Sequence, residues 1–355
     1  PLNVNGDRQG CRIENGAVVT PDGFTDAWKQ LGEGGWLSMS LPPEFGGQGI
    51  PELIAVIGKE TQLAANQGFT IGASLTTGAA NLIYTFGSDV QKNEFCQNMF
   101  SGKWAGTMCL TEPHAGSAVG DVITIATKQE EGHYLIKGTK QFITNGDHDM
   151  ADNIVHLLLA RTPNSQQGSK GISLFIVPKK RPDGSQNDIT LVSIEHKMGI
   201  NGSPTCVLSF GDNDDCHGYL LEAENMGMEQ MFKLMNEARL LVGLQGLAGA
   251  SAAVQNAWAY ANERTQGPSS IHPEKKASII EFPDVRRMLM HMKAVTEGLR
   301  ALMYTSAWYI DMANHGPEAH SEKYQDLLDL HIPICKAFGT DQGFDVARTG
   351  IQVLG

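Results

Sequence analysis

Apolar residues in the first hundred positions recur at intervals of three and four, the spacing of one face of a helix. After an irregular start, this spacing predicts helices over residues 24–31, 53–65 and 90–100. Residues 41–49 are rich in proline and glycine and are predicted to form a connecting loop. The N-terminal part, taken as residues 1–104, is therefore expected to be mostly helical.

The same helical spacing returns in residues 222–355. It predicts one helix from about residue 225 to Glu263, a second through residues 285–302 and a third at roughly 321–349. Long amphipathic helices bury their apolar faces by packing against one another. This last part of the chain is therefore expected to form a helical bundle.

Three glycines, Gly243, Gly246 and Gly249, lie inside the first helix of the predicted bundle. Each costs the helix about 1 kcal/mol relative to alanine. A glycine also leaves room for another backbone or a ligand, and close packing of a second helix is the expected use.

Between the helical parts, residues 105–221 carry short apolar and β-branched runs separated by Gly, Pro, Asn and Ser clusters. Short strands at such spacing are typical of a small barrel or sandwich. The predicted strands cover residues 134–137, 154–160, 172–177, 189–194 and 206–210.

Composition narrows the possible functions. The chain has 27 Lys and Arg against 39 Asp and Glu, a formal charge of −12, which argues against non-specific nucleic-acid binding. The six cysteines include no C-x-x-C pair, so reduced thiols and a cytoplasmic location are predicted. The histidines lack metal-ligand spacing, so no metal is expected, and no apolar run reaches the roughly 20 residues of a transmembrane helix. The chain begins at Pro1 rather than Met, and we expect it to be truncated at both ends.

One loop carries a cluster of groups suited to close approach of a polar ligand. It runs from Cys109 through Thr111 to Ser117 and is interrupted at Pro113. Ala115, Gly116 and Ser117 leave the backbone uncrowded, so amide groups there can face a phosphate or carbonyl oxygen. The two hydroxyls can donate or accept hydrogen bonds. An ordinary surface turn explains the same residues equally well on chemistry alone.

Two segments resemble the flavin-binding signature of the acyl-CoA dehydrogenases. Residues 110–117 (LTEPHAGS) are similar to the first flavin segment of that family, and residues 142–146 (FITNG) to the second. Residues 235–239, 285–289 and 297–300 also resemble family strings, most closely those of the long subfamily that includes 3-methylmercaptopropionyl-CoA dehydrogenase. The resemblance implies an α+β fold with N-terminal helices, a small middle β-barrel and a C-terminal helical bundle.

The resemblance also implies FAD as cofactor and an acyl-CoA thioester as substrate. Positions that match CoA-binding residues of the family are Ser117, Asn236 and Arg239. Phe142 stands where many relatives have Trp, and Thr144 is implied to lie near flavin N5. Arg264 matches the contact to the flavin diphosphate, and Gln352 and Gly355 match residues that reach the FAD of a neighbouring subunit, which implies a homo-oligomer (dimer or tetramer). The implied cofactor-binding residues are Met108, Leu110, Thr111, Gly116, Ser117, Phe142, Ile143, Thr144, Arg264, Gln352 and Gly355.

In this family a carboxylate removes the α proton of the thioester while the β hydrogen leaves as hydride. Most relatives take that carboxylate from a string beyond the position of Gly355; others take it from the position that is Ala238 here. The neighbouring Glu237 lies about 100° around the helix. We therefore expect no catalytic residue within this chain and a base located after Gly355.

Four functions remain open on the sequence. The first is dehydrogenation of an acyl-CoA with electrons passed to an electron-transfer flavoprotein, and the second is a flavin-dependent oxidase or monooxygenase that uses O₂. The third is a DNA-associated relative, which the net charge of −12 disfavours. The fourth is a helical binding protein without enzymatic activity, which would bind no flavin.

Overall fold

The computed structural model describes residues 2–270 and 272–355, and these form two compact units. The barrel unit comprises the chain up to Ile50 together with Asn66–Glu237. The helical unit comprises Pro51–Ala65 and Ala238–Gly355. The predicted division at residues 104 and 221 stays a prediction.

The barrel unit begins with a helix and a hairpin where the sequence indicated an irregular start. Helix α1 (Leu2–Gln9) precedes strands β1 (Arg12–Glu14) and β2 (Ala17–Val19). Helix α4 was not predicted. The other helices of this unit lie at or near the predicted positions. They are α2 (Phe24–Glu33), α5 (Asp89–Gln91) and α6 (Gln97–Phe100), the last two joined by a π-helical turn at Lys92–Cys96, whereas the unpredicted α4 spans Gln67–Phe86.

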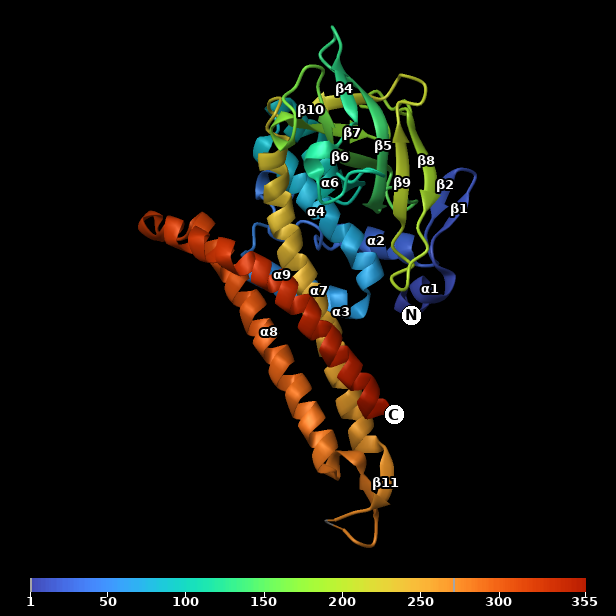
Figure 1. The fold of residues 1–355 in the computed structure, drawn as a ribbon, viewed down its shortest axis with the longest axis vertical. Coiled ribbons are helices and arrows are strands. Elements are labelled where there is room, and N and C mark those ends of the chain that lie inside the picture. Colours follow the sequence, from blue (N-terminus) through green and yellow to red (C-terminus); the bar gives the residue numbers. More distant parts are fainter. Residues whose placement is uncertain (1, 271) are drawn as a thin grey trace. The chain divides into compact units, whose positions relative to one another are not determined.

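Eight strands form the barrel predicted for the middle of the chain (Figure 1). The sheet order is β10-β7-β6-β4-β5-β9-β8, and a further β10–β5 pairing closes a ring, while β3 pairs with β6. Strands β3, β4 and β10 were missed, and β5 is longer than predicted. The strands are β3 (Trp104–Cys109), β4 (Ile125–Lys128), β5 (Tyr134–Thr144), β6 (Asn153–Arg161), β7 (Ile172–Pro178), β8 (Ile189–Ile194), β9 (Thr205–Phe210) and β10 (His217–Leu220).

The barrel is filled by alternate side chains of these strands. Ile136, Leu158, Phe175 and Phe210 are each at most 1% exposed and belong to one apolar cluster. Burying side chains of this size provides about 1.5–3 kcal/mol each. The strand ends that carry the two signature segments, at Cys109 and Thr144, are therefore held by a rigid core.

Three long helices dominate the helical unit (Figure 1). Helix α7 (Gly227–Glu263) begins in the barrel unit, and α3 (Glu52–Ala65), α8 (Pro283–His315) and α9 (Glu318–Leu354) complete the bundle. Strands β11 (Thr265–Pro268) and β12 (Lys276–Ser278) form a hairpin between α7 and α8. The predicted third helix ended near residue 349; α9 in fact continues to Leu354 because Val346 and Val353 are buried in the bundle.

Glycines bring α7 and α9 into backbone contact, which confirms the expected use of Gly243 and Gly246. A Cβ atom at Gly246 would lie 2.1 Å from the Gly339 carbonyl oxygen, and one at Gly243 would lie 2.5 Å from the Cys335 oxygen. No residue other than glycine fits such distances without displacing a helix.

A buried carboxylate ties α3 to α8. The Arg300 guanidinium donates to Glu60 (Nη2 to Oε1, 2.8 Å), and the Tyr304 hydroxyl donates to the other carboxylate oxygen at 2.6 Å. Burial and the hydrogen bond to Glu60 raise the pKa of Tyr304 to about 12, so it remains a donor at neutral pH.

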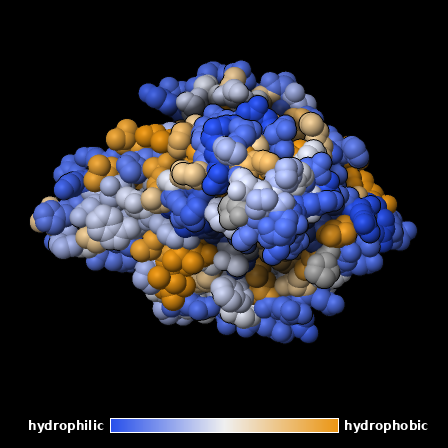
Figure 2. Space-filling view, turned by 90° about the horizontal axis from the view of Figure 1, so that it is seen from below, coloured by the Kyte–Doolittle hydropathy of each residue, from blue (hydrophilic) through white to orange (hydrophobic). Residues whose placement is uncertain are grey.

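On the surface, hydrophobic side chains occur in separate groups between hydrophilic ones (Figure 2).

Candidate functional site

The two signature segments lie side by side at one end of the barrel. The first follows β3, and the second forms the last residues of β5. The Gln141 N–H donates to the Thr111 carbonyl oxygen at 2.8 Å, and the Lys140 ammonium donates to the Leu110 carbonyl oxygen at 3.1 Å. The two residues directly before the second segment thus contact the main chain of the first, some thirty positions earlier in the chain.

Three hydroxyls in these segments have no protein hydrogen-bond partner within the part of the chain that the structure describes. Thr111 and Thr144 are half-buried, and Ser117 is exposed. A Cβ atom built on Gly116 would meet nothing within 4 Å, so the backbone beside Ser117 is open. The segments therefore offer donors and acceptors to a ligand rather than to the protein.

Phe142 stands out because its backbone is strained. Its φ is 58°, in the left-handed region that costs a residue with a side chain about 1–2 kcal/mol. The β5–β9 register shifts between Lys140 and Ile143, so the chain bulges here. The bulge leaves 56% of Phe142 exposed while Ile143 is only 2% exposed. Strain of this kind persists where the surrounding structure determines it, and often at functional sites.

A buried ion pair links the first segment to β5, just before the second segment. Lys140 Nζ lies 2.8 Å from Glu112 Oε1, and the Glu112 carboxylate also accepts the N–H groups of Ile123 (2.8 Å) and Thr124 (3.0 Å). Burial opposes charge on Glu112, but the Lys140 ammonium and these donors outweigh it and lower the pKa of the carboxyl group. For Lys140, burial lowers the pKa of the ammonium even though Glu112 acts against it.

Sequence reasoning missed Glu112 and Lys140 as a pair. A signal was available, because Tyr134 and Ile136 are inward-facing positions of β5, and Lys140 continues that alternation. A lysine at an inward strand position requires a buried acid, and Glu112 lies in the neighbouring signature segment.

Buried polar groups also fix the turn that follows Thr144. Asp147 accepts the Val18 N–H at 3.0 Å and pairs with Lys179. Two fully buried histidines lie close by: burial lowers the pKa of His148 to about 4 and that of His156 to about 3. Both imidazoles are therefore neutral near pH 7.

The remaining predicted residues lie on the long helices or directly after their ends. Asn236 is on the part of α7 that belongs to the barrel unit; Arg239 and Arg264 belong to the helical unit. Gln352 is in the last turn of α9 and Gly355 is at its end, on either side of Val353, which shares an apolar cluster with Ala257 and Ala261 of α7.

Glu237, the acid nearest the predicted substrate residues in sequence, is engaged within the barrel unit. Asn81 donates its amide to Glu237 Oε1 at 2.7 Å, which joins α7 to α4. A Cβ atom at Gly78 would lie 3.8 Å from the other carboxylate oxygen, so the side chain packs closely on α4. This arrangement suits a structural role for Glu237.

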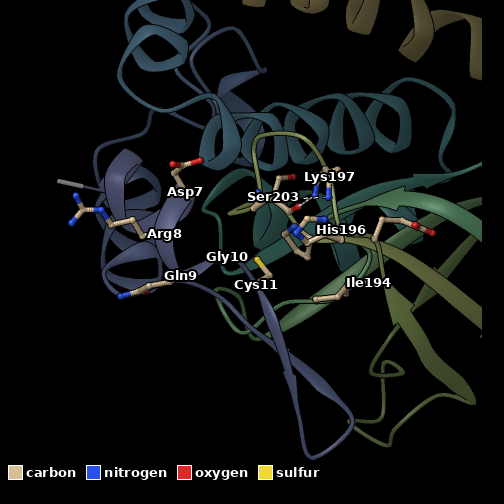
Figure 3. Close-up of a pocket in the computed structure, with 12 residues that line it drawn as sticks. Asp7, Arg8, Gln9, Gly10, Cys11, Ile194, His196, Lys197 and Ser203 are labelled. Carbon is tan, nitrogen blue, oxygen red and sulfur yellow. Dashed lines mark hydrogen bonds between the residues drawn. The ribbon is translucent and has the colours of Figure 1, made fainter.

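A cavity of about 300 Å³ lies between the end of α1 and residues 194–204 (Figure 3). Figure 3 shows Arg8 extending away from Cys11, and Lys197 lying beside Ser203, whose carbonyl oxygen accepts the Lys197 ammonium at 2.8 Å. Burial raises the pKa of the Cys11 thiol to about 12, so it is not a nucleophile at neutral pH. None of the predicted site residues lines this cavity.

Family models match nearly the whole chain. The acyl-CoA dehydrogenase N-terminal domain matches residues 14–103, the middle domain residues 107–213 and the C-terminal domain residues 225–355. An acyl-CoA dehydrogenase of Bacillus subtilis is 30% identical over 92% of this chain and 78% of its own length. The chain belongs to the acyl-CoA dehydrogenase family.

Longer relatives are more similar in sequence. The chain is 43% identical to 3-methylmercaptopropionyl-CoA dehydrogenase of Ruegeria pomeroyi and 40% identical to a butyryl-CoA dehydrogenase of Syntrophomonas wolfei, with all of this chain covered in both cases. It spans 61% of the length of each. The predicted resemblance to the long subfamily is confirmed.

Solved structures of the family share the fold. Butyryl-CoA dehydrogenase from Megasphaera elsdenii matches with a TM-score of 0.81 at 26% identity, covering 100% of this chain and 84% of that one. A chain from a structure described as the electron transferring flavoprotein of Acidaminococcus fermentans matches with a TM-score of 0.78 at 30% identity, over 93% and 79% of the two chains. Within residues 2–270 and 272–355, no helix is long and apolar enough to cross a membrane.

Proposed function

We propose that the protein carries out FAD-dependent α,β-dehydrogenation of an acyl-CoA thioester and passes the electrons to an electron-transfer flavoprotein. The observation that supports this most strongly is the Gln141–Thr111 hydrogen bond of 2.8 Å, because it ties the first segment that the family uses for flavin to the residue directly before the second. The names of the relatives, acyl-CoA dehydrogenases acting on short chains among them, support the reaction class.

The residues of the barrel unit fit a flavin. Thr111 and Thr144 present hydroxyls with no protein partner in the described chain, and Phe142 offers an exposed aromatic face at the same edge. In this proposal Met108, Leu110 and Ile143 supply apolar contact beneath the ring, and Gly116 and Ser117 follow along the cofactor. The redox chemistry would be that of bound FAD, whose N5 position accepts a hydride.

Binding of the CoA portion is proposed for Ser117, Asn236 and Arg239. A guanidinium group suits phosphate and carbonyl oxygens because it presents several donors in one plane. A hydroxyl near the thioester can orient it so that its α and β carbons face the flavin, which lowers the barrier through positioning.

A homo-oligomer is proposed as the working form. Gln352 and Gly355 match residues that the family uses toward a neighbouring subunit's cofactor, and Arg264 matches the contact to the flavin diphosphate. The outer side of α9 is apolar at four-residue intervals, with Leu330 61%, Ile334 44% and Phe338 48% exposed in the single chain, which supports an interface. The six free cysteines support the proposed cytoplasmic location.

Anaerobic mixing of the FAD-loaded full-length protein with a panel of acyl-CoA thioesters tests the proposal. Bleaching of the flavin by at least one thioester, with slow reoxidation in air and fast reoxidation by an electron-transfer flavoprotein, is the expected result. Fast reoxidation by O₂ would favour the oxidase alternative. Protein that binds FAD and is bleached by no thioester would contradict the proposal.

A further inference from the structure

Arg161, at the end of β6, makes an unusual set of contacts. Its guanidinium donates to four main-chain carbonyl oxygens and to no side chain: to Val122 from Nε (2.9 Å), Gln166 from Nη1 (2.9 Å), Gly168 from Nη2 (2.8 Å) and Gly120 from Nη2. No carboxylate in the described chain lies within ion-pair distance of it. All five of its N–H groups can serve such acceptors because they lie in one rigid plane.

These contacts join two loops that are distant in sequence. Gly120 and Val122 belong to the loop that follows Ser117, and Gln166 and Gly168 belong to the loop between β6 and β7. The loops also touch directly, since a Cβ atom at Gly120 would lie 3.2 Å from the Ser169 nitrogen. The Arg161 guanidinium is therefore hydrogen-bonded to both loops at once.

Arg161 and Glu112 both bind the main chain of the loop after Ser117, one through its carbonyl oxygens and the other through its N–H groups. The Arg161 guanidinium donates hydrogen bonds to the carbonyl oxygens of residues 120 and 122. The Glu112 carboxylate accepts hydrogen bonds from the N–H groups of residues 123 and 124. The Arg161 N–H also donates to the Thr124 carbonyl oxygen at 2.9 Å. Peptide groups fixed from both sides cannot rotate, so the conformation of the loop is set before any ligand arrives.

We propose that Arg161 is a positioning residue for binding of the CoA portion of the substrate. The proposal rests on the proposed function, in which Ser117 contacts that portion. Ser117 lies three residues before Gly120, and its hydroxyl has no protein partner in the described chain. Without Arg161 the loop would have to be ordered at the moment of binding, which weakens affinity and leaves the reaction of the bound complex unchanged.

The test compares Arg161→Met, Arg161→Lys and, as a matched control, Arg12→Met, which removes an exposed arginine of the same unit. Calorimetry of the FAD-loaded full-length protein gives Kd for a CoA thioester, and anaerobic stopped flow gives the rate constant of flavin bleaching at saturation. We expect Kd to rise about tenfold or more in Arg161→Met, by a smaller factor in Arg161→Lys, and by less than about twofold in the control. The bleaching rate constant should stay within about twofold.

Two results would overturn the positioning role. One is a wild-type Kd in the arginine variants, and the other is a fall in the bleaching rate constant by the same factor as the rise in Kd. If Arg161→Met does not fold, Arg161→Lys decides, because an ammonium cannot serve four separated carbonyls and wild-type affinity would then contradict the proposal. A wild-type protein that binds no CoA thioester contradicts the proposed function as well. If the wild-type protein binds the thioester tightly and the Arg161 variants bind it with the same Kd, only the role of Arg161 is contradicted.

Discussion

Lys140 and Glu112 form an ion pair inside the barrel, with Nζ 2.8 Å from Oε1 and neither side chain more than 1% exposed. The pair sits directly beneath the two signature segments, because Lys140 also donates to the Leu110 carbonyl oxygen. Its contribution is to hold these segments in place. A buried pair of this kind adds little net stability, yet removal of one partner is costly.

Lys140→Met should therefore destabilise the protein strongly. The substitution leaves the Glu112 charge buried with only hydrogen-bond donors around it, and we expect the free energy of unfolding in urea to fall by about 3–5 kcal/mol. The double variant Lys140→Met/Glu112→Gln should recover part of this loss. Lys137→Met on the same strand, which breaks the exposed pair with Asp214, should leave the free energy of unfolding nearly unchanged. Equal losses at positions 140 and 137 would contradict this account.

His148 and His156 should make stability depend on pH below neutrality. Their pKa values fall to about 4 and about 3 in the folded protein, whereas an unfolded histidine titrates near about 6.5. The unfolded state therefore binds more protons below pH ~6.5, so stability is complete above that pH and is lost as the pH falls. The slope should approach ~1.4 kcal/mol per pH unit for each histidine.

Urea unfolding at several pH values between neutrality and the folded-state pKa values measures this slope. His148→Asn/His156→Gln should flatten it, and His291→Gln, which changes an exposed histidine of α8, should retain it. An unchanged slope in the double variant would show that other groups control the acid response.

Gly246→Ala should loosen the helical unit. The added Cβ would lie 2.1 Å from the Gly339 carbonyl oxygen, so α9 must shift, at a cost of about 1–3 kcal/mol. Gly298→Ala on α8 is the matched control, because its Cβ meets nothing within 4 Å and alanine favours the helix by about 0.5–1 kcal/mol. Thermal unfolding should thus move in opposite directions in the two variants. A shift of the same sign in both would contradict the contact between α7 and α9.

Phe142→Gly should separate stability from function. Glycine adopts a φ of 58° without strain, and the lost side chain is already 56% exposed, so we expect the melting temperature to hold or rise. Flavin affinity should fall because the aromatic wall is gone. Phe142→Trp should retain both properties. A glycine variant that melts well below wild type and binds FAD normally would refute the functional origin of the strain.

The helices that the sequence predicted are those with one apolar face, such as α7 and α8. Helix α4 was missed because much of its buried surface consists of small or hydroxyl-bearing residues such as Gly72, Ala73 and Thr76, so large apolar side chains do not recur at helical spacing. Strand β3 was missed for a related reason: it consists largely of small residues buried on both faces and pairs in parallel with β6.

In the candidate site, too, some residues could be predicted from the sequence and others could not. Thr111, Ser117 and Thr144 were found because they stand in short motifs that resemble a known family. Arg161 carries no local signal of its own, and the inward strand position of Lys140 indicates a buried partner without identifying it. The partners of both residues lie in loops that the closed barrel brings near. Such tertiary partners follow from strand pairing and register, which spacing along one chain does not reveal.

The central claim is that Thr111 and Thr144 contact one flavin, and titration of the apoprotein with FAD tests it most directly. Thr111→Val and Thr144→Val should each raise Kd for FAD about fivefold, the loss of one hydrogen bond, and the double variant should deviate from the product of the two effects because both hydroxyls serve one ring. Thr127→Val, an exposed threonine of β4, should bind as wild type. Wild-type affinity in both single variants would contradict the account.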